Sequence, residues 1–213
     1  MKQLALDIGL ASGPTLARFF AGPNEAALQH LRLWAGEGSQ PDTRSPVPTY
    51  LWGEAGSGKT HLLKAVRQAL SDQGASVGWL DASVASAAEF DERWAAVVLD
   101  DVHLYSTAQQ AMAFNWFVNA ISPANGAPRW VLAAGNLPPA DLPLRDDLRS
   151  RLGWGHVFQL QLLGEAERRA VLRQEADARG VFLGDEVMDY MLNRFSRDLG
   201  SLMQLLDQLD AFA

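Results

Sequence analysis

The sequence predicts an α/β fold, in which a parallel β-sheet is flanked by helices and is followed by a small all-helical domain. Up to residue 163, short apolar runs that suit buried strands alternate with stretches that suit amphipathic helices. This alternation is typical of a parallel sheet covered on both faces. From residue 164 onward the apolar pattern is helical only. A glycine-rich motif between the first strand and the next helix is the third supporting observation.

The expected elements follow the chain in order. Residues 1–13 are short, small and glycine-containing, which is typical of a flexible arm. Residues 14–163 make up the expected α/β domain, and residues 164–213 the expected helical lid. Asn24 is the expected N-cap of the first helix, at 26–34. A Gly/Ser/Pro-rich loop is expected at 36–48. Strands are expected at 47–52, 76–80, 95–99, 130–134 and 157–160, and further helices at 61–73, 109–121, 165–179, 185–195 and 197–211.

The glycine-rich motif predicts a nucleotide site. Residues 53–60 read GEAGSGKT, a complete G-x-x-x-x-G-K-[ST] phosphate loop between a strand and a helix. Such a loop points backbone N–H groups at phosphate oxygens, with the positive end of a helix behind them. Its lysine reaches the β- and γ-phosphates, and its last hydroxyl binds Mg²⁺. The expected nucleotide-binding residues are Gly53, Gly56, Ser57, Gly58, Lys59, Thr60 and His61.

Two further strands end in polar residues that suit nucleotide chemistry. Asp100 and Asp101 follow the strand at 95–99. We expect Asp100 to hold Mg²⁺ together with Thr60, and Asp101 to orient the water that attacks the γ-phosphate. A solvated turn is the alternative interpretation. Asn136 follows the strand at 130–134 on the same edge of the sheet, where its amide can hold that water, although Asn-Leu-Pro-Pro is also a simple turn signal.

A basic cluster at 148–155 precedes the last expected strand. It lies beyond the nucleotide edge of the sheet, where an arginine can project toward a neighbouring subunit and stabilise transition-state charge. We expect Arg151 to be this arginine finger, and Arg149 and Arg145 are the next candidates. An ordinary loop of salt-bridged arginines is the alternative. Arg197 opens the last expected helix, from which it can fold back over the phosphates, whereas a solvated arginine is the common case there.

Composition excludes several classes of protein. The 213 residues include no cysteine, which excludes disulfides and thiolate chemistry. The chain has no apolar run long enough for a membrane span, and its first residues lack the pattern of a secretory signal. With a nucleotide site, this predicts a cytoplasmic protein with no membrane partner. A net charge of −7 argues against a main role in binding duplexes, so any contact with DNA is expected to be indirect.

These features in this order resemble AAA+ ATPases. Three stretches narrow the resemblance to the family of the bacterial replication initiator DnaA: LDDVH at 99–103, SRLGWG at 150–155 and RDLGSL at 197–202. The resemblance covers residues 14–210 and is greatest to Hda-like regulators, which inactivate DnaA after replication starts. It implies a P-loop sheet with a helical lid, ADP or ATP with Mg²⁺ as cofactors, and a sensor role for Asn136 and Arg197.

Three features favour the Hda-like group over DnaA itself. The chain stops after the expected lid, without the basic domain that binds duplex DNA in DnaA. Residues 81–96 leave little room for the extra helices through which DnaA-type proteins contact single strands. The N-terminal sequence QLALDI resembles the peptide that docks bacterial proteins on the DNA sliding clamp. Its expected clamp-binding residues are Gln3 at the rim of the pocket and Leu4, Leu6 and Ile8 in apolar cavities.

The resemblance therefore implies a nucleotide-bound regulator with DnaA and the β sliding clamp as partners. Arg151 is expected to stimulate ATP hydrolysis on DnaA and so to regulate replication initiation negatively. The alternative is an autonomous AAA+ ATPase that acts as a DnaA- or DnaC-like initiator or helicase loader, and a scaffold without catalytic output is a third class. Whether the chain hydrolyses ATP, whether it holds ADP or ATP, and whether it forms a homodimer stay open.

Overall fold

A five-stranded parallel sheet forms the centre of the molecule. The computed structural model describes residues 13–36, 47–84, 89–123, 126–194 and 199–212. The strands lie in the order β2-β3-β4-β1-β5, and every neighbouring pair is parallel. This arrangement confirms the predicted α/β fold. The strands are β1 (Thr49–Trp52), β2 (Ser76–Leu80), β3 (Trp94–Leu99), β4 (Trp130–Gly135) and β5 (His156–Gln159).

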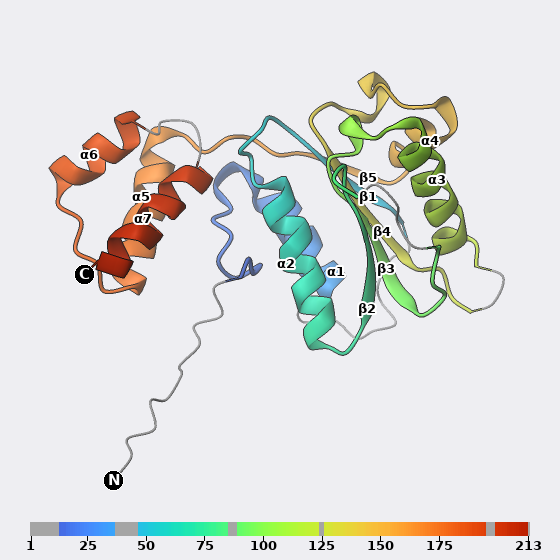
Figure 1. Ribbon diagram of the computed structural model, residues 1–213, viewed down its shortest axis with the longest axis horizontal. Coiled ribbons are helices and arrows are strands. Elements are labelled where there is room, and N and C mark those ends of the chain that lie inside the picture. Colours follow the sequence, from blue (N-terminus) through green and yellow to red (C-terminus); the bar gives the residue numbers. More distant parts are fainter. Residues whose placement is uncertain (1–12, 37–46, 85–88, 124–125, 195–198, 213) are drawn as a thin grey trace, which may run out of the picture.

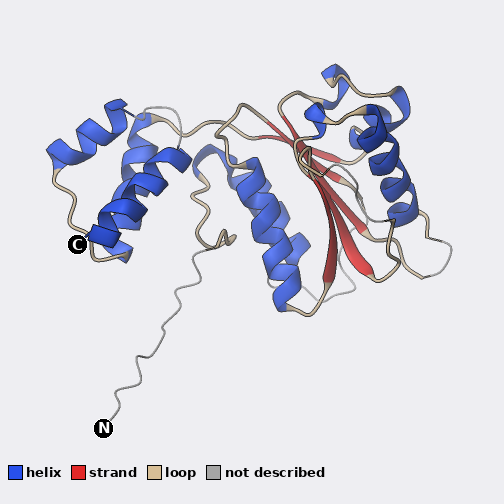
Figure 2. Cartoon of the chain, viewed as in Figure 1, coloured by secondary structure: helices blue, strands red, loops and turns tan. Residues whose placement is uncertain are grey.

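Helices cover both faces of the sheet, as Figures 1 and 2 show. Helices α1 (Glu25–Ala35) and α2 (Lys59–Asp72) lie on one face, and α3 (Thr107–Ile121) and α4 (Asp146–Leu152) on the other. The central strand β4 is buried throughout and its side chains alternate between the two layers. Leu132 and Ala134 pack with α1 and α2, whereas Val131 and Ala133 pack with α3 and α4. The uniformly apolar strand therefore serves two cores.

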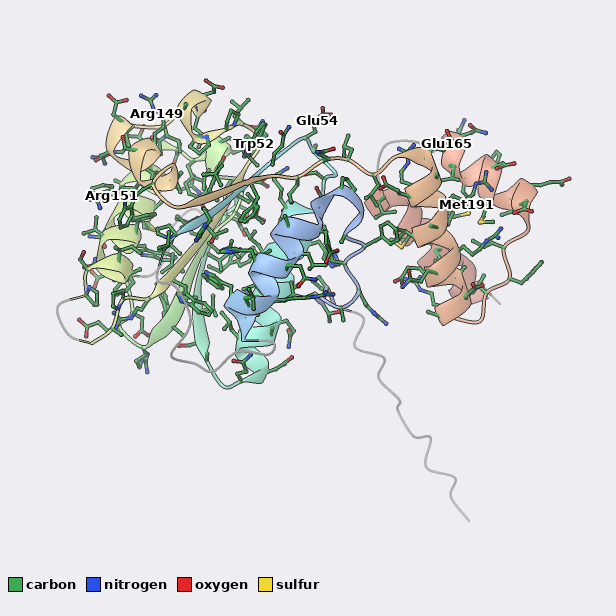
Figure 3. The ribbon with its side chains drawn as sticks, turned by 180° about the vertical axis from the view of Figure 1, so that it is seen from behind. Trp52, Glu54, Arg149, Arg151, Glu165 and Met191 are labelled. Atoms are coloured by element: carbon green, nitrogen blue, oxygen red, sulfur yellow. The ribbon has the colours of Figure 1, made fainter. Side chains whose placement is uncertain are left out.

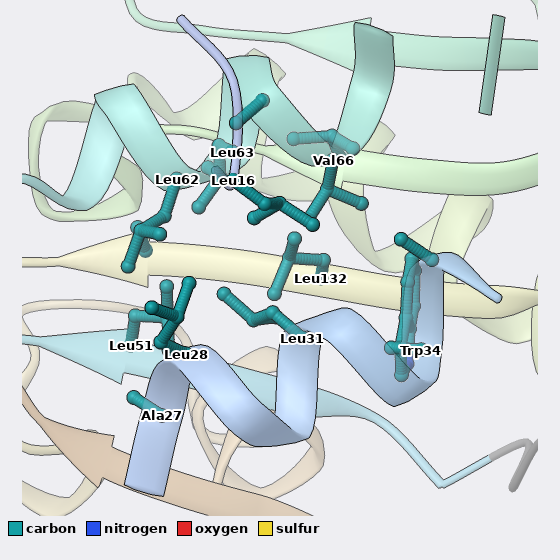
Figure 4. Close-up of a cluster of buried hydrophobic side chains, with 14 of the residues drawn as sticks. Leu16, Ala27, Leu28, Leu31, Trp34, Leu51, Leu62, Leu63, Val66 and Leu132 are labelled. Atoms are coloured by element: carbon teal, nitrogen blue, oxygen red, sulfur yellow. The ribbon is translucent and has the colours of Figure 1, made fainter. Parts of the chain in front are cut away.

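The core beneath α1 and α2 positions the phosphate loop. Leu31 of α1 and Leu62 and Val66 of α2 are fully buried against Leu51 of β1 and Leu132 of β4 (Figure 4). Burying a side chain of this size stabilises the fold by roughly 1.5–3 kcal/mol. Because this packing fixes both β1 and α2, it also fixes the loop that joins them.

The last three helices form a separate lid. They are α5 (Glu165–Ala178), α6 (Asp185–Arg194) and α7 (Leu199–Phe212), and they enclose their own apolar core. Arg173 of α5 pairs with Asp185 of α6 at 2.6 Å, and Arg169 pairs with Asp189. In Figure 1 the lid lies beside α1 and α2, and a single extended segment connects it to β5 of the sheet. Within the described ranges, no helix combines the length and apolar character that a membrane crossing requires.

The basic cluster at 148–155, where no helix was predicted and a loop was the alternative interpretation, is helical in its first five residues, and only 153–155 lie in a turn. Residues 146–152 form helix α4, and Arg151 lies in its last turn. Acidic Asp146 and Asp147 stand in the first turn and arginines in the last, which suits the helix dipole. Leu148 and Leu152 are buried one turn apart and fix the helix on the sheet. The short helix was missed because only two of its residues are apolar.

The structure also corrects the expected role of Asn24. It precedes α1, but its side chain makes no capping hydrogen bond to that helix. Instead its amide donates to the Gln161 carbonyl at 3.0 Å and accepts from the Gln161 N–H at 2.8 Å. A helical turn at Gly22–Asn24 leads into α1 and turns the side chain toward the segment that enters the lid. Asn24 therefore joins two distant segments rather than capping a helix.

Candidate functional site

A cleft of about 880 Å³ opens between the core and the lid. Its walls are the phosphate loop and start of α2, the segment at 13–20, and parts of α5 and α7. Among the residues that the structure describes, five lysine or arginine side chains line it, against two acidic ones, although the whole chain carries a net charge of −7. The cleft is thus a local positive site that suits an anionic ligand. The charged lining residues are Arg18, Lys59, Lys64, Asp101, Arg168, Glu175 and Arg179.

Glycines give the phosphate loop its shape. Gly56 and Gly58 have φ angles of 83° and 93°, a left-handed conformation that other residues adopt at a cost. Gly58 immediately precedes α2, and a Cβ there would meet the ring of Phe19 at 2.6 Å. Gly53 closely approaches the residue that follows β5, since a Cβ on it would lie 2.2 Å from the Leu160 carbonyl oxygen. The loop therefore curls tightly at the N-terminus of α2, where backbone N–H groups are free of intrahelical partners.

Lys59 is buried inside this loop. Its Nζ donates to the carbonyl oxygens of Gly53 at 2.7 Å and Glu54 at 2.9 Å, and lies 3.5 Å from Ser57 Oγ. Burial lowers the pKa of Lys59, while the nearby Asp101 and Asp100 carboxylates raise it. An ammonium group held by weak carbonyl acceptors is available to a stronger anionic acceptor, such as a phosphate.

The two acids after β3 have different surroundings. Asp100 is only 3% exposed, and burial raises its pKa, whereas a hydrogen bond from the Thr60 hydroxyl lowers it. Asp101 lines the cleft, with a left-handed backbone at φ 50° and its N–H donating to Asp100 Oδ1 at 3.0 Å. Asp100 is thus paired with the end of the phosphate loop, while Asp101 faces the ligand space.

The Thr60 and Asp100 pair suits Mg²⁺. A hydroxyl and a carboxylate are hard oxygen ligands, and Mg²⁺ is typically held by one or two protein oxygens together with substrate phosphates and water. A raised pKa from burial also fits, because a cation would compensate the buried carboxylate. In the described part of the chain, no group of three or more His, Asp or Glu side chains could hold a metal alone. These two residues would therefore hold Mg²⁺ only with help from a ligand's phosphates.

Two further expected residues lie near this edge of the sheet. Asn136 directly follows β4, which pairs with β1 on one side and β3 on the other. It is exposed and is not part of the cleft lining. His61 does line the cleft, with its Nε2 3.3 Å from the Thr15 carbonyl oxygen. Burial lowers the pKa of His61, which favours a neutral ring packed near Phe19.

The arginines in and next to α4 do not line the cleft. Arg145 pairs with Asp147 and Arg149 with Asp146, each at 2.6 Å. Arg151 is exposed and forms no ion pair within the described residues. Figure 3 places Arg149 and Arg151 at the end of the core remote from the lid, with Glu54 of the phosphate loop between them and the lid. Arg151 is therefore separated from the cleft of its own chain.

Some of the expected site residues lie outside the described residues, and two residues that line the cleft were not predicted from the sequence. Arg197 and the clamp-peptide residues Gln3, Leu4, Leu6 and Ile8 lie outside the described residues. Sequence reasoning did not identify Phe19 or Arg168, which both line the cleft. Neither belongs to a motif. The helical spacing of residues 168, 171 and 175 is a signal for one face of α5, but it does not say which face meets the cleft.

Comparisons with known proteins find similarity to the Hda lid domain and to a bacterial protein of similar length. The family model described as "Hda, lid domain" matches residues 165–213. An uncharacterized protein of Haemophilus influenzae is 33% identical over 218 residues, which cover 98% of this chain and 90% of that protein. The similarity thus extends along the whole chain and is not confined to the phosphate loop.

Solved structures of replication initiators share the fold. Domain III of DnaA from Thermotoga maritima superposes with a TM-score of 0.72 and 19% identity, covering 99% of this chain and 90% of that one. AMPPCP-bound DnaA from Aquifex aeolicus gives a TM-score of 0.72 and 20% identity, covering 92% of this chain. This chain spans 64% of the length of that DnaA chain. At such identities the likeness concerns the fold.

Proposed function

Because the chain belongs to the Hda-like, DnaA-related family of AAA+ proteins, we propose that it is a nucleotide-bound regulator of the initiator DnaA. In this proposal it docks on the DNA sliding clamp and supplies Arg151 to ATP bound on DnaA. Hydrolysis on the partner then leaves ADP on DnaA and limits replication initiation. DnaA and the clamp are the proposed partners, DNA is reached only through them, and the activity is cytoplasmic.

The state of Arg151 is the observation that carries this proposal. A finger that acts on a partner must be exposed and must not already be neutralised by its own chain. Arg145 and Arg149 each pair with an aspartate, whereas Arg151 is exposed and unpaired among the described residues. Arg151 lies at the end of the core remote from the lid and is not part of the lining of its own cleft. Both observations support action on a nucleotide bound to another chain.

The cleft supports the binding of ADP or ATP with Mg²⁺ by this chain. Its excess of cationic side chains, the buried Lys59 and the Thr60–Asp100 pair all suit a nucleotide phosphate chain. The Aquifex aeolicus relative was solved with AMPPCP, a nucleotide of the same kind. A ligand held between lid and core also stabilises the folded chain by mass action, so the nucleotide has a structural role.

An autonomous ATPase is the second candidate. The Lys59 loop, the Thr60–Asp100 pair and the cleft-facing Asp101 supply the groups that hydrolysis in cis requires. The net charge of −7 weighs against a loader that grips DNA strands. The described residues between β2 and β3 (81–84 and 89–93) contain turns and no helix, so they offer no added strand-binding element.

The test is hydrolysis of labelled ATP already bound to DnaA. The rate is measured with DnaA alone, with this chain, with clamp loaded on DNA, and with both. We expect faster hydrolysis on DnaA only when both are present. No stimulation in the complete mixture would contradict the regulator proposal. Hydrolysis of free ATP by this chain, under the same conditions, would then favour the autonomous ATPase.

A further inference from the structure

One face of lid helix α5 forms a wall of the cleft. Arg168, Val171, Glu175 and Arg179 all line it, and their spacing of three or four residues places them on one side of the helix. The opposite wall contains Lys59 and the rest of the phosphate loop. A ligand on the loop therefore faces side chains of the lid.

Two of the acids near Arg168 on α5, Glu167 and Glu175, are already engaged. Glu175 pairs with Arg179 at 3.5 Å, and both side chains are about four-fifths buried, at 19% and 21% exposed. Glu167 accepts a hydrogen bond from the Gly164 N–H at 2.6 Å and so caps the start of α5. Neither acid is therefore available to neutralise Arg168.

Arg168 has no partner among the described residues. Its Nε is buried and makes no hydrogen bond, and the described chain offers it no ion pair. Leaving a donor of a charged group buried without an acceptor is costly, and native proteins seldom do so without a reason. A ligand with an anionic acceptor in this cleft would remove that cost.

We infer that Arg168 is a phosphate-binding residue that the lid contributes to the nucleotide site, an inference that rests on the proposed nucleotide binding. The guanidinium presents several donors to the anionic phosphate chain, which is the natural charged acceptor that a nucleotide brings into the cleft. Phosphates held by Lys59 from the core and by Arg168 from the lid fix the lid against the core. Lid position then depends on the bound nucleotide.

The test compares binding of ADP to the full chain and to Arg168→Gln by calorimetric titration. We expect Arg168→Gln to weaken ADP binding by about tenfold or more, the usual size for a lost charge-assisted hydrogen bond. Inorganic pyrophosphate, used to displace ADP, should weaken by a similar factor. The unliganded variant should unfold close to the wild-type temperature, because the Arg168 side chain has no hydrogen bond or ion pair to lose among the described residues.

Two matched variants complete the experiment. Arg173→Gln removes the same charge from the same helix, but Arg173 pairs with Asp185 on the lid surface and should leave ADP affinity within about twofold of wild type. Arg168→Lys keeps the charge and should bind ADP more tightly than Arg168→Gln. If Arg168→Gln folds poorly, Arg168→Lys can be compared with wild type in its place.

Three results would overturn the inference. Unchanged ADP affinity in Arg168→Gln would remove Arg168 from the site. A loss for ADP without a loss for pyrophosphate would assign the contact to the nucleoside instead of the phosphates. Wild-type protein that binds no ADP at all would overturn the proposed nucleotide site together with this inference, whereas the first two results leave that site intact.

Discussion

At the scale of single residues, His30 is placed where a positive charge is disfavoured. It lies on α1 with its Nε2 2.8 Å from Thr49 Oγ1, and its ring centre is 4.6 Å from that of His156 and 5.0 Å from that of Phe158. Burial, and then the charge of His156, lower the pKa of His30 from 6.5 to about 4. The folded state therefore favours the neutral imidazole.

This shift predicts a loss of stability in mild acid. The unfolded chain takes up a proton on His30 below pH 6.5, whereas the folded chain resists until about pH 4. The contribution of His30 is thus complete above pH 6.5 and is lost as the pH falls toward 4, by on the order of 1–3 kcal/mol. Urea unfolding at several pH values should show a smaller acid loss for His30→Gln than for wild type. Parallel losses in the two proteins would show that His30 is not the cause.

Asp101 shows how far sequence reasoning reaches at this scale. The strand pattern predicts two acids at the end of β3, and both are there. The expected roles, Asp100 for Mg²⁺ and Asp101 for the attacking water, came from the order of the acids, whereas the backbone conformation of Asp101 is visible only in the structure. Among the described residues other than glycine, Asp101 alone has a positive φ, and this left-handed turn accompanies its place in the cleft lining. Aspartate adopts this conformation at a modest cost.

At the scale of elements, Asn24 connects α1 to the entrance of the lid. Its two hydrogen bonds to the Gln161 backbone span 137 residues of sequence. Asn24→Ala should lower the free energy of unfolding by roughly 1–3 kcal/mol. Asn24→Asp can accept from the Gln161 N–H but cannot donate to its carbonyl, so it should be intermediate.

A matched control separates this connection from helix capping. Aspartate and asparagine are equally good N-cap residues. Full stability in Asn24→Asp would therefore support helix capping and contradict the proposed connection between Asn24 and the Gln161 backbone. Gln29→Ala, which removes an exposed hydrogen bond to Glu25 on the same helix, should leave stability unchanged. Equilibrium unfolding in urea measures all three variants.

Strands and long helices could be predicted because their apolar residues repeat with a clear period. For β2 the predicted and observed bounds coincide at Ser76–Leu80. Helix α4 could not be predicted this way, since it has only seven residues and is held by Leu148 and Leu152 and by charges at its ends. Contacts that cross the chain, such as Asn24 with Gln161, leave no periodic signal at all.

At the scale of the whole molecule, the lid and the α4 arginines lie at opposite ends of the core (Figure 3). The cleft is lined by segments near residues 18, 59, 101 and 168, which lie far apart in the sequence. The excess of positive side chains in the cleft therefore cannot be seen before the fold is known. The motif predicted the phosphate loop, but the sequence did not show that a face of α5 lines the cleft opposite it.

The proposed clamp peptide predicts a separable defect. Replacing Gln3 and Leu4 by alanine should abolish binding to purified sliding clamp, because the peptide would lose its rim hydrogen bond and one apolar anchor. ADP affinity and unfolding temperature should not change, because the two substitutions leave the phosphate loop at 53–60 and both apolar cores of the sheet intact. Surface plasmon resonance against immobilised clamp measures the effect. Wild-type affinity in the double variant would remove clamp docking from the proposed function.

Hydrolysis of DnaA-bound ATP in the presence of Arg151→Ala tests the central claim most directly. The variant should fold, bind ADP and bind the clamp normally, because Arg151 is exposed and makes no ion pair among the described residues. An arginine finger contributes about 10³–10⁵ in rate, so the stimulation should disappear almost completely. Arg149→Ala, which breaks only the pair with Asp146, should retain it. Undiminished stimulation by Arg151→Ala would contradict the proposal that this arginine acts on DnaA.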